Sequence, residues 1–253
     1  MLAIDYRGFG HSTGNPTEEG LILDASAAVD WAMHVAGVSA DRIVLLGQSL
    51  GTAVTSAVAE RYASQGVDFA GVVLVSGFSS LPAMLSDYAI AGFVPVLRPL
   101  KIIPPLLRFV LGYIADDWQS ADRLKEMVRA VKGRGGRLRL SLIHAKNDWD
   151  IPCREDNKLF AHAVNGTVDD PAGIDPETLE EEKERRTVDR GIYESVTIWK
   201  DGGIEIRQDL FPYGGESNRR ARMTLAMAPN ADIFRPQRHH DVRTGHIGCI
   251  KSL

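Results

Sequence analysis

Cysteine is scarce in this chain, because Cys153 and Cys249 are the only two in 253 residues. Two such thiols cannot build a disulfide framework, and they give no cysteine-based metal site. A strong charge of one sign is also missing. The net charge of −4 and the pI near 6.0 provide no electrostatic basis for binding nucleic acid. The hydrophobic content of 44% is instead typical of a globular protein with a packed core.

Long uninterrupted hydrophobic runs are absent as well, and a transmembrane helix needs about 20 such residues. Residues 1–4 carry no basic side chain and Asp5 follows them directly, so we expect no signal peptide. The most apolar segment, 89–114, is interrupted by four prolines and three basic residues. We interpret 81–118 as a cap in which 89–114 faces an acyl chain or a membrane surface. Ordinary helices packed on the sheet are the alternative, and the cellular location stays open between cytoplasm and membrane surface.

Apolar segments that alternate with helical patterns predict a single α/β domain over residues 1–253. Their unbroken apolar character predicts a mostly parallel sheet with helices on both faces. A helix is expected from Pro16, with Asn15 as its N-cap and Gly37 at its end. A second helix is expected over 50–63. The predicted strands are 2–6, 42–47, 69–76 and 137–145.

The C-terminal part of the chain has a different composition. Residues 165–195 form an acidic insertion, in which 176–186 is either a solvated helix or part of a disordered segment. The apolar runs 196–200 and 204–211 flank an Asp-Gly-Gly turn, which favours a hairpin or a bulged final strand. The polar tail after Pro229 has no clean period.

Ser49 stands at the apex of the pattern Gly47-Gln48-Ser49-Leu50-Gly51, between the strand at 42–47 and the helix at 50–63. A G-x-S-x-G turn between a strand and a helix is typical of a nucleophile elbow, where the backbone at serine is strained and the turn is tight. The N-terminus of the following helix directs its N–H groups at the reaction centre. The alternative is a turn that only closes a βα unit.

A serine nucleophile needs a histidine to take its proton and a carboxylate to orient that histidine. An elbow serine is followed along the chain first by the acid and then by the histidine. Asp148 follows the strand at 137–145 and is our candidate for the acid. Asp150 and simple turn chemistry are the alternatives.

The histidine is harder to assign. Three of the seven histidines stand in the wrong place or order, namely His11, His34 and His144, and His162 falls on a predicted helix. His246 has small neighbours, Gly245 and Gly248, which suit a loop that reaches inward, so it is our candidate base. The pair His239 and His240 and the absence of any functional histidine stay open as alternatives.

Four motifs occur in one order along the chain: Asp5–Ser12, Gly47–Gly51, Ala121–Leu124 and Leu142–Pro152. Together they resemble the α/β-hydrolase superfamily, and most of all the serine hydrolases that include monoacylglycerol lipases and lysophospholipases. The resemblance covers residues 1–165 and 203–215. It implies Ser49 as the nucleophile and Asp148, four residues before Pro152, as the acid.

The chain departs from that family at both ends. The family has strands before the Asp5 motif and a His-Gly loop there that donates one oxyanion N–H. This chain begins after them, so we expect a fold that lacks the first strands and keeps the N–H of Leu50 as an oxyanion donor. Loss of one donor costs about a hundredfold in rate or more. At the other end, Glu216 occupies the place where the family has its histidine.

The resemblance implies a serine hydrolase that cleaves carboxylic esters, with a monoacylglycerol or a lysophospholipid as substrate. Ser49, His246 and Asp148 would form the triad, and no cofactor or metal is expected. The partners would be a small acyl ester or lipid, and a membrane surface through 89–114, but no nucleic acid. The alternative is a catalytically impaired or truncated module of the same fold that binds a lipid or partner without turnover. A peptidase is a weaker third hypothesis.

Overall fold

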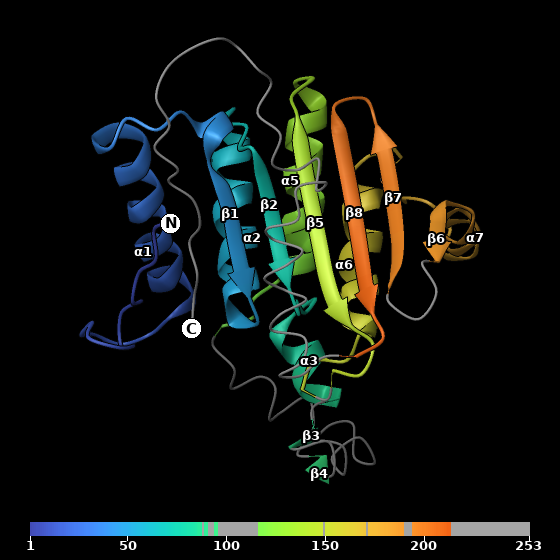
Figure 1. Ribbon diagram of the computed structural model, residues 1–253, viewed down its shortest axis with the longest axis horizontal. Coiled ribbons are helices and arrows are strands. Elements are labelled where there is room, and N and C mark those ends of the chain that lie inside the picture. The colour runs from blue at the N-terminus through green and yellow to red at the C-terminus, as the bar shows by residue number, and fades with distance from the viewer. Residues whose placement is uncertain are drawn as a thin grey trace.

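The computed structural model describes residues 1–87, 89–90, 94–95, 116–148, 150–170, 172–189 and 194–213. They form a six-stranded sheet with helices packed along it (Figure 1). The helices are α1 (Glu18–Asp30), η1 (Trp31–Val35), η2 (Ala40–Arg42), α2 (Leu50–Ser64), α3 (Leu81–Asp87), α5 (Ser120–Gly133), α6 (Arg154–Asn165) and α7 (Pro176–Arg186). The strands are β1 (Val44–Gln48), β2 (Gly71–Val75), β3 (Ala89–Ile90), β4 (Val94–Pro95), β5 (Leu138–Ala145), β6 (Thr187–Asp189), β7 (Ser195–Asp201) and β8 (Ile204–Phe211).

The six strands lie in the order β1-β2-β5-β8-β7-β6. The first four are parallel to their neighbours, whereas β7 runs antiparallel to β8 and β6 antiparallel to β7. The predicted mostly parallel sheet is therefore confirmed. The short strands β3 and β4 pair with each other in a separate two-stranded sheet.

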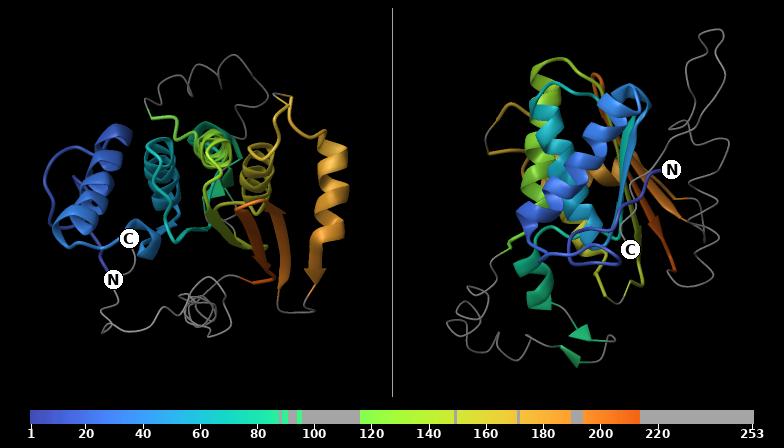
Figure 2. Two further views of the ribbon diagram at one scale, coloured as in Figure 1. Left: turned by 90° about the horizontal axis from the view of Figure 1, so that it is seen from above. Right: turned by 90° about the vertical axis from the view of Figure 1, so that its left-hand side faces the viewer.

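Four helices, α1, α2, α5 and α6, lie side by side along one face of the sheet (Figure 2). Within the described ranges no helix covers the opposite face, so these ranges contain one of the two helical layers that the sequence predicts. The buried core joins this layer to the sheet. Leu74 of β2, Val54 of α2 and Leu142 of β5 are all fully buried, as expected for strands with continuous apolar runs.

The first helix begins two residues later than predicted. Thr17, not Asn15, is the N-cap, and its hydroxyl accepts a hydrogen bond from the backbone N–H of Gly20 at 3.2 Å. Because threonine satisfies one of the free N–H groups of the first turn, it can take the capping position from the earlier asparagine. The predicted apolar stripe is buried as far as Ala32, but Val35 in the wider turn of η1 is exposed.

The predicted strand at 2–6 is wrong, because these residues form no strand. Leu2 and Ile4 do pack against the core and Tyr6 is buried, so the apolar pattern reflects packing alone. A strand also needs a hydrogen-bonded neighbour, and among the described residues β1 pairs only with β2. The segment turns immediately afterwards, where the N–H of Phe9 bonds the carbonyl of Tyr6 at 2.9 Å.

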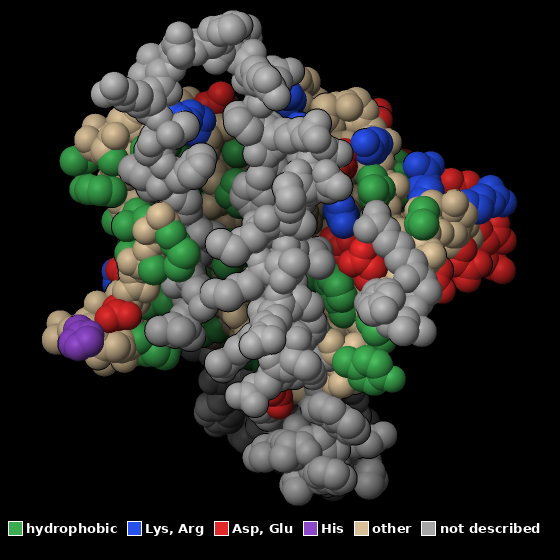
Figure 3. Space-filling model, viewed as in Figure 1, with side chains coloured by type: hydrophobic (Ala, Val, Ile, Leu, Met, Phe, Trp, Pro, Cys, Tyr) green, Lys and Arg blue, Asp and Glu red, His purple; other side chains and the backbone are tan. Residues whose placement is uncertain are grey.

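Most of the acidic insertion at 165–195 lies within the described residues. Its predicted helix is α7, and its charged side chains gather at the right edge of the molecule (Figure 3). The predicted hairpin is present as β7 and β8. The sequence did not predict the edge strand β6, which pairs Val188 with Val196. Of the predicted cap at 81–118, only α3, β3, β4 and residues 116–118 are described, so most of it lies outside the described residues.

None of the helices in the described part of the chain is both long and apolar enough to cross a bilayer.

The close contact between β1 and α2 depends on Gly47, which has no side chain. A Cβ atom placed on Gly47 would lie 2.2 Å from the backbone oxygen of Gly51 and 2.6 Å from the Thr55 hydroxyl. Both contacts are shorter than atoms tolerate, and the first is to backbone that cannot rotate away. Glycine at 47 therefore sets how closely the helix approaches the strand.

We expect Gly47→Ala to lower the free energy of unfolding by about 3 kcal/mol, the upper part of the range for overpacking a core. The matched control is Gly133→Ala at the end of α5, where a Cβ would meet no atom within 4 Å. That change should leave the stability unchanged or raise it by up to about 1 kcal/mol. Urea unfolding followed by circular dichroism measures both, and equal midpoints for the two variants would contradict this account.

Candidate active site

Ser49 lies in the one-residue gap between β1 and α2, with φ of 53° and ψ of −123°. Few residues other than glycine adopt a positive φ, and such strain costs about 1–3 kcal/mol. The surrounding backbone holds it in place. The Ser49 N–H donates to the carbonyl of Val75 at 3.0 Å, and the Ser49 carbonyl accepts from Thr52 N–H at 2.9 Å and from the Thr52 hydroxyl at 2.6 Å.

The Ser49 side chain makes no capping hydrogen bond to α2, and the residue is exposed. Serine before a helix usually caps it by accepting from the first-turn N–H groups. Here the backbone conformation directs the hydroxyl elsewhere, and the first residue of the helix is Leu50. The hydroxyl is thus accessible for chemistry, and the helix begins beside it.

Asp148 lies in the turn after β5, with its side chain 17% exposed. One carboxylate oxygen, Oδ1, accepts the backbone N–H groups of Asp150 and Ile151, both at 3.0 Å. Asp150, the alternative acid, is exposed and supplies one of these N–H groups. The turn therefore fixes one oxygen of Asp148, while the other, Oδ2, is directed elsewhere.

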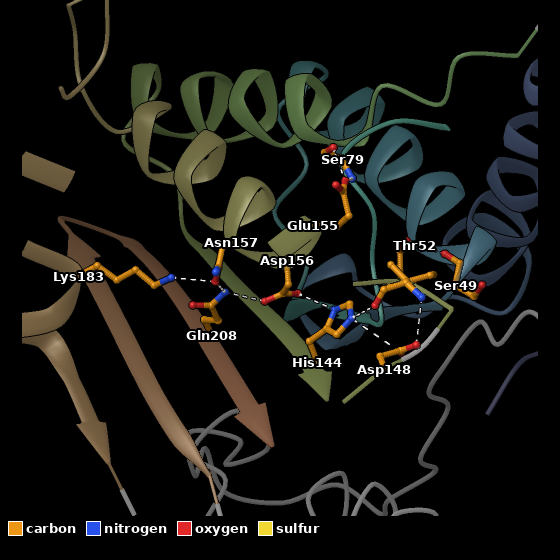
Figure 4. Close-up of polar contacts among 11 residues, drawn as sticks. Ser49, Thr52, Ser79, His144, Asp148, Glu155, Asp156, Asn157, Lys183 and Gln208 are labelled. Carbon is orange, nitrogen blue, oxygen red and sulfur yellow. Dashed lines mark hydrogen bonds and ion pairs between the residues drawn. The ribbon is translucent and has the colours of Figure 1, made fainter. Parts of the chain in front are cut away.

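Ser49 and Asp148 lie at the same edge of the sheet. They follow β1 and β5, which are both parallel to β2 between them. Since the carboxyl ends of parallel strands meet at one edge, the two side chains come from one rim, as predicted. Figure 4 shows both together with the polar residues described below.

The three candidate histidines of the tail, His239, His240 and His246, lie outside the described residues, as does Glu216. Two of the other histidines lie on the surface beside acids of their own neighbourhood. His11 lies 3.5 Å from Asp5, and His34 lies 3.9 Å from Asp30. His162 of α6 is partly exposed, with Nδ1 3.3 Å from an oxygen of Asp122.

His144 of β5 is buried directly beside the Asp148 turn. Its Nε2 lies 2.8 Å from the carbonyl oxygen of Ile151 and 3.8 Å from Oδ2 of Asp148. The ring therefore contacts the same turn that orients Asp148. Its side chain is 0% exposed, so His144 itself cannot meet a substrate in this arrangement.

A buried chain of polar side chains leads from His144 of β5 past α6 to Lys183 of α7 (Figure 4). Nδ1 of the ring lies 3.6 Å from Oδ1 of Asp156, whose Oδ2 accepts from the Gln208 amide at 2.7 Å. The same amide lies 3.1 Å from Oδ1 of Asn157, which also accepts from Lys183 at 2.9 Å. This buried chain, His144 to Lys183, joins β5, α6, β8 and α7.

Two pKa shifts reflect the burial of this chain. Burial opposes a charge on His144, but its contacts with Asp156 outweigh burial and raise the pKa of the ring. Burial lowers the pKa of Lys183, whose ammonium lies 5.4 Å from the centre of the Phe160 ring. His144 precedes Asp148 in the chain, against the order expected for a catalytic histidine, and Asp156 lies too far from it in sequence for any short motif to join them.

A second buried carboxylate ties α6 to the segment after β2. Glu155 accepts from the backbone N–H of Ser79 at 2.9 Å, from the Ser79 hydroxyl at 2.5 Å and from Lys158 at 2.6 Å. Burial opposes its charge, yet these donors outweigh burial and lower the pKa of Glu155. The start of α6 is thus fixed against the chain that leads into α3.

The described residues contain no group of three side chains that could hold a metal ion. An open hollow of about 760 Å³ lies between the N-terminal segment and α1, lined by Asp5, Arg7 and Asp24 among others. None of its lining residues belongs to the Ser49 turn or to the Asp148 turn.

The sequence is similar to a known protein family and to several curated proteins. Residues 1–98 match the family described as alpha/beta hydrolase fold. The uncharacterized protein YfhR of Salmonella typhi is 34% identical over 171 residues, which are 64% of this chain and 49% of that protein. Human protein ABHD12B is 29% identical over 168 residues, 65% of this chain and 42% of that protein. The chain thus spans about half the length of the curated relatives it matches.

A solved structure shares the fold. The crystal structure of an alpha-beta hydrolase from Vibrio vulnificus superposes with a TM-score of 0.53, covering 88% of this chain and 59% of that chain, at 17% sequence identity. The family match, the related sequences and the shared arrangement of sheet and helices agree with the resemblance of the motifs. The described part of the chain has the α/β-hydrolase fold, and its first 98 residues match the family of that name.

Proposed function

We propose that this protein is a serine hydrolase that cleaves carboxylic esters, with Ser49 as the nucleophile. One observation carries the proposal: an exposed serine stands at φ 53° between a parallel strand and a helix, on the same sheet edge as the Asp148 turn. A backbone held in a strained conformation at an accessible nucleophile is a feature of functional sites.

The proposed reaction is acyl transfer through an acyl-enzyme. The Ser49 hydroxyl attacks the ester carbonyl while a histidine takes its proton, and Asp148 orients that histidine and stabilises its charged form. The N–H of Leu50, the first residue of α2, would donate to the oxygen that becomes negative. We propose His246 as the base, because it follows Asp148 in the chain and has glycine on both sides of its short segment.

We further propose an acyl lipid, such as a monoacylglycerol or a lysophospholipid, as the substrate. The apolar segment 89–114 supports this, because an acyl chain needs an apolar surface beside the ester. The same segment would let the protein approach a membrane surface.

Ser49→Ala should abolish labelling by a fluorophosphonate, which reacts only with an activated serine. The matched control is Ser64→Ala, at the other end of α2, where the exposed hydroxyl bonds only the Arg61 carbonyl at 2.7 Å among the contacts described. The control should label like wild type, as read on a gel after equal exposure. Undiminished labelling of Ser49→Ala would refute the proposal. A folded wild-type protein that never labels would favour the alternative, a module that binds without turnover.

His246→Ala should slow fluorophosphonate labelling of Ser49 by about a hundredfold or more, since the general base contributes about 10²–10⁴. His239→Ala and His240→Ala serve as controls from the same tail and should label at nearly the wild-type rate. The measurement is the labelling rate constant of each purified variant. If His246→Ala labels as fast as wild type, another group is the base.

A further inference from the structure

His144 and Asp156 face each other across a buried gap that requires a proton. Nδ1 of the ring and Oδ1 of the carboxylate are 3.6 Å apart, and both side chains are 0% exposed. Within the described part of the chain, neither atom has a hydrogen-bond partner. Buried polar atoms without a partner are rare and costly.

The other ring nitrogen decides where that proton belongs. Nε2 lies 2.8 Å from the Ile151 carbonyl oxygen, which can only accept, so Nε2 must carry a hydrogen. In a neutral ring Nδ1 would then present a lone pair to the Asp156 carboxylate. A proton between Nδ1 and Oδ1 removes this repulsion and joins the two groups.

Three observations favour a charged ring over a protonated carboxylate. Oδ2 of Asp156 accepts from the Gln208 amide at 2.7 Å, and such a donor favours the ionised carboxylate. A second carboxylate, Asp148, lies 3.8 Å from Nε2. The pKa of His144 is raised, in the same direction, despite the burial that opposes it.

The other groups around the ring do not reverse this balance. Burial raises the pKa of the nearby Cys153 thiol, which keeps it neutral. The Lys183 ammonium is separated from Asp156 by the Asn157 amide. β2, the other neighbour of β5, carries no charged residue.

On β8, alternate side chains point to opposite faces. Gln208 faces Asp156, so Arg207 and Asp209 on either side of it face away. These two pair with each other, with the guanidinium 2.8 Å from the carboxylate. The charges nearest the His144 ring are therefore two carboxylates.

We propose that His144 is a positioning residue for the acid of the site, held as an imidazolium by Asp156. Its Nε2–H donates a hydrogen bond to the Ile151 carbonyl, and the Ile151 N–H donates one to Oδ1 of Asp148. Its positive charge lies beside Oδ2 of the same carboxylate. The charge state of the ring stands on the geometry around His144 and Asp156, whereas its effect on catalysis rests on the proposed function.

The charge on His144 has a definite effect on the pH profile. Asp148 stabilises the protonated form of the catalytic histidine, and the nearby imidazolium offsets part of that stabilisation. If His144 loses its charge, the catalytic histidine keeps its proton to a higher pH. Because the enzyme is active only when that histidine is unprotonated, the acidic limb of kcat/KM should move to higher pH.

Asp156→Asn changes the charge while it keeps the hydrogen bonds. The new amide donates to Nδ1 of a neutral ring, and its oxygen still accepts from Gln208. The matched control is Asp122→Asn, the same change at an exposed position on α5. We expect Asp156→Asn, and not Asp122→Asn, to move the acidic limb upward by about half a pH unit, with p-nitrophenyl butyrate as the probe.

Two changes at position 144 separate charge from shape. His144→Gln can still donate to the Ile151 carbonyl but carries no charge. Because the Asp156 carboxylate stays, the upward shift of the acidic limb should be at least as large as in Asp156→Asn, with a plateau of kcat/KM within about tenfold of wild type. His144→Leu loses both the charge and the hydrogen bond to the Ile151 carbonyl, and it should lower the plateau of kcat/KM further than His144→Gln does. An unchanged limb in Asp156→Asn and His144→Gln would mean a structural role only and would overturn the catalytic half of the proposal.

The deciding measurement is nitrogen-15 NMR of histidine-labelled protein, with His144→Gln used to assign the signals. The His144 ring should keep both nitrogens protonated at a pH where the exposed histidines in the same spectrum have become neutral, and it should lose one proton in Asp156→Asn. A neutral ring in folded wild type would overturn the proposal. This result needs no turnover, so a failure of ester hydrolysis would reject the proposed function while the charge of His144 is still decided by the spectrum.

Discussion

The parallel pairing of β1, β2 and β5 is the constraint on which the candidate site depends. Ladder hydrogen bonds align Leu45 with Val72 and Val72 with Leu140, so the three strands end at one edge of the sheet. Ser49 and Asp148 lie in turns beyond that edge, and His144 is the next-to-last residue of β5. The bond from the Ser49 N–H to the Val75 carbonyl extends the ladder by one residue, and it ties the strained turn to the end of β2.

Much of this arrangement is predictable because it is local in sequence. An unbroken apolar run before Ser49 predicts a strand, and the helical pattern after it predicts a helix, with a glycine on each side of the serine turn. The structure has this strand and this helix as β1 and α2. Asp148 stands directly after the apolar strand β5, which places it on the rim. The roles of Ser49 and Asp148 in catalysis stay predictions, because the fold shows their position and not their chemistry.

The parts that sequence reasoning missed are those that depend on distant partners. Residues 2–6 have the composition of a strand, but pairing and not composition makes a strand, and no described strand lies beside them. Thr17 replaced Asn15 as the cap because capping depends on where the chain turns toward α1. Nothing in the sequence selects His144, because it precedes Asp148 in the chain. Its importance is visible only when Asp156 and Gln208, 52 residues apart in sequence, are seen to meet.

The buried chain from His144 to Lys183 has a consequence for which parts of the molecule support each half of the site. The hydrogen bonds of the Ser49 backbone join it to Thr52 and Val75, which both lie in the first third of the chain. The Asp156 carboxylate, in contrast, accepts from the Gln208 amide of β8, the strand that pairs with β5. The hydrogen bonds that hold the nucleophile are therefore local in sequence, whereas those that support the acid turn join segments far apart in the chain. A change in β8 would thus act on the acid side of the site through Gln208 and Asp156 without touching any hydrogen-bond partner of the Ser49 backbone.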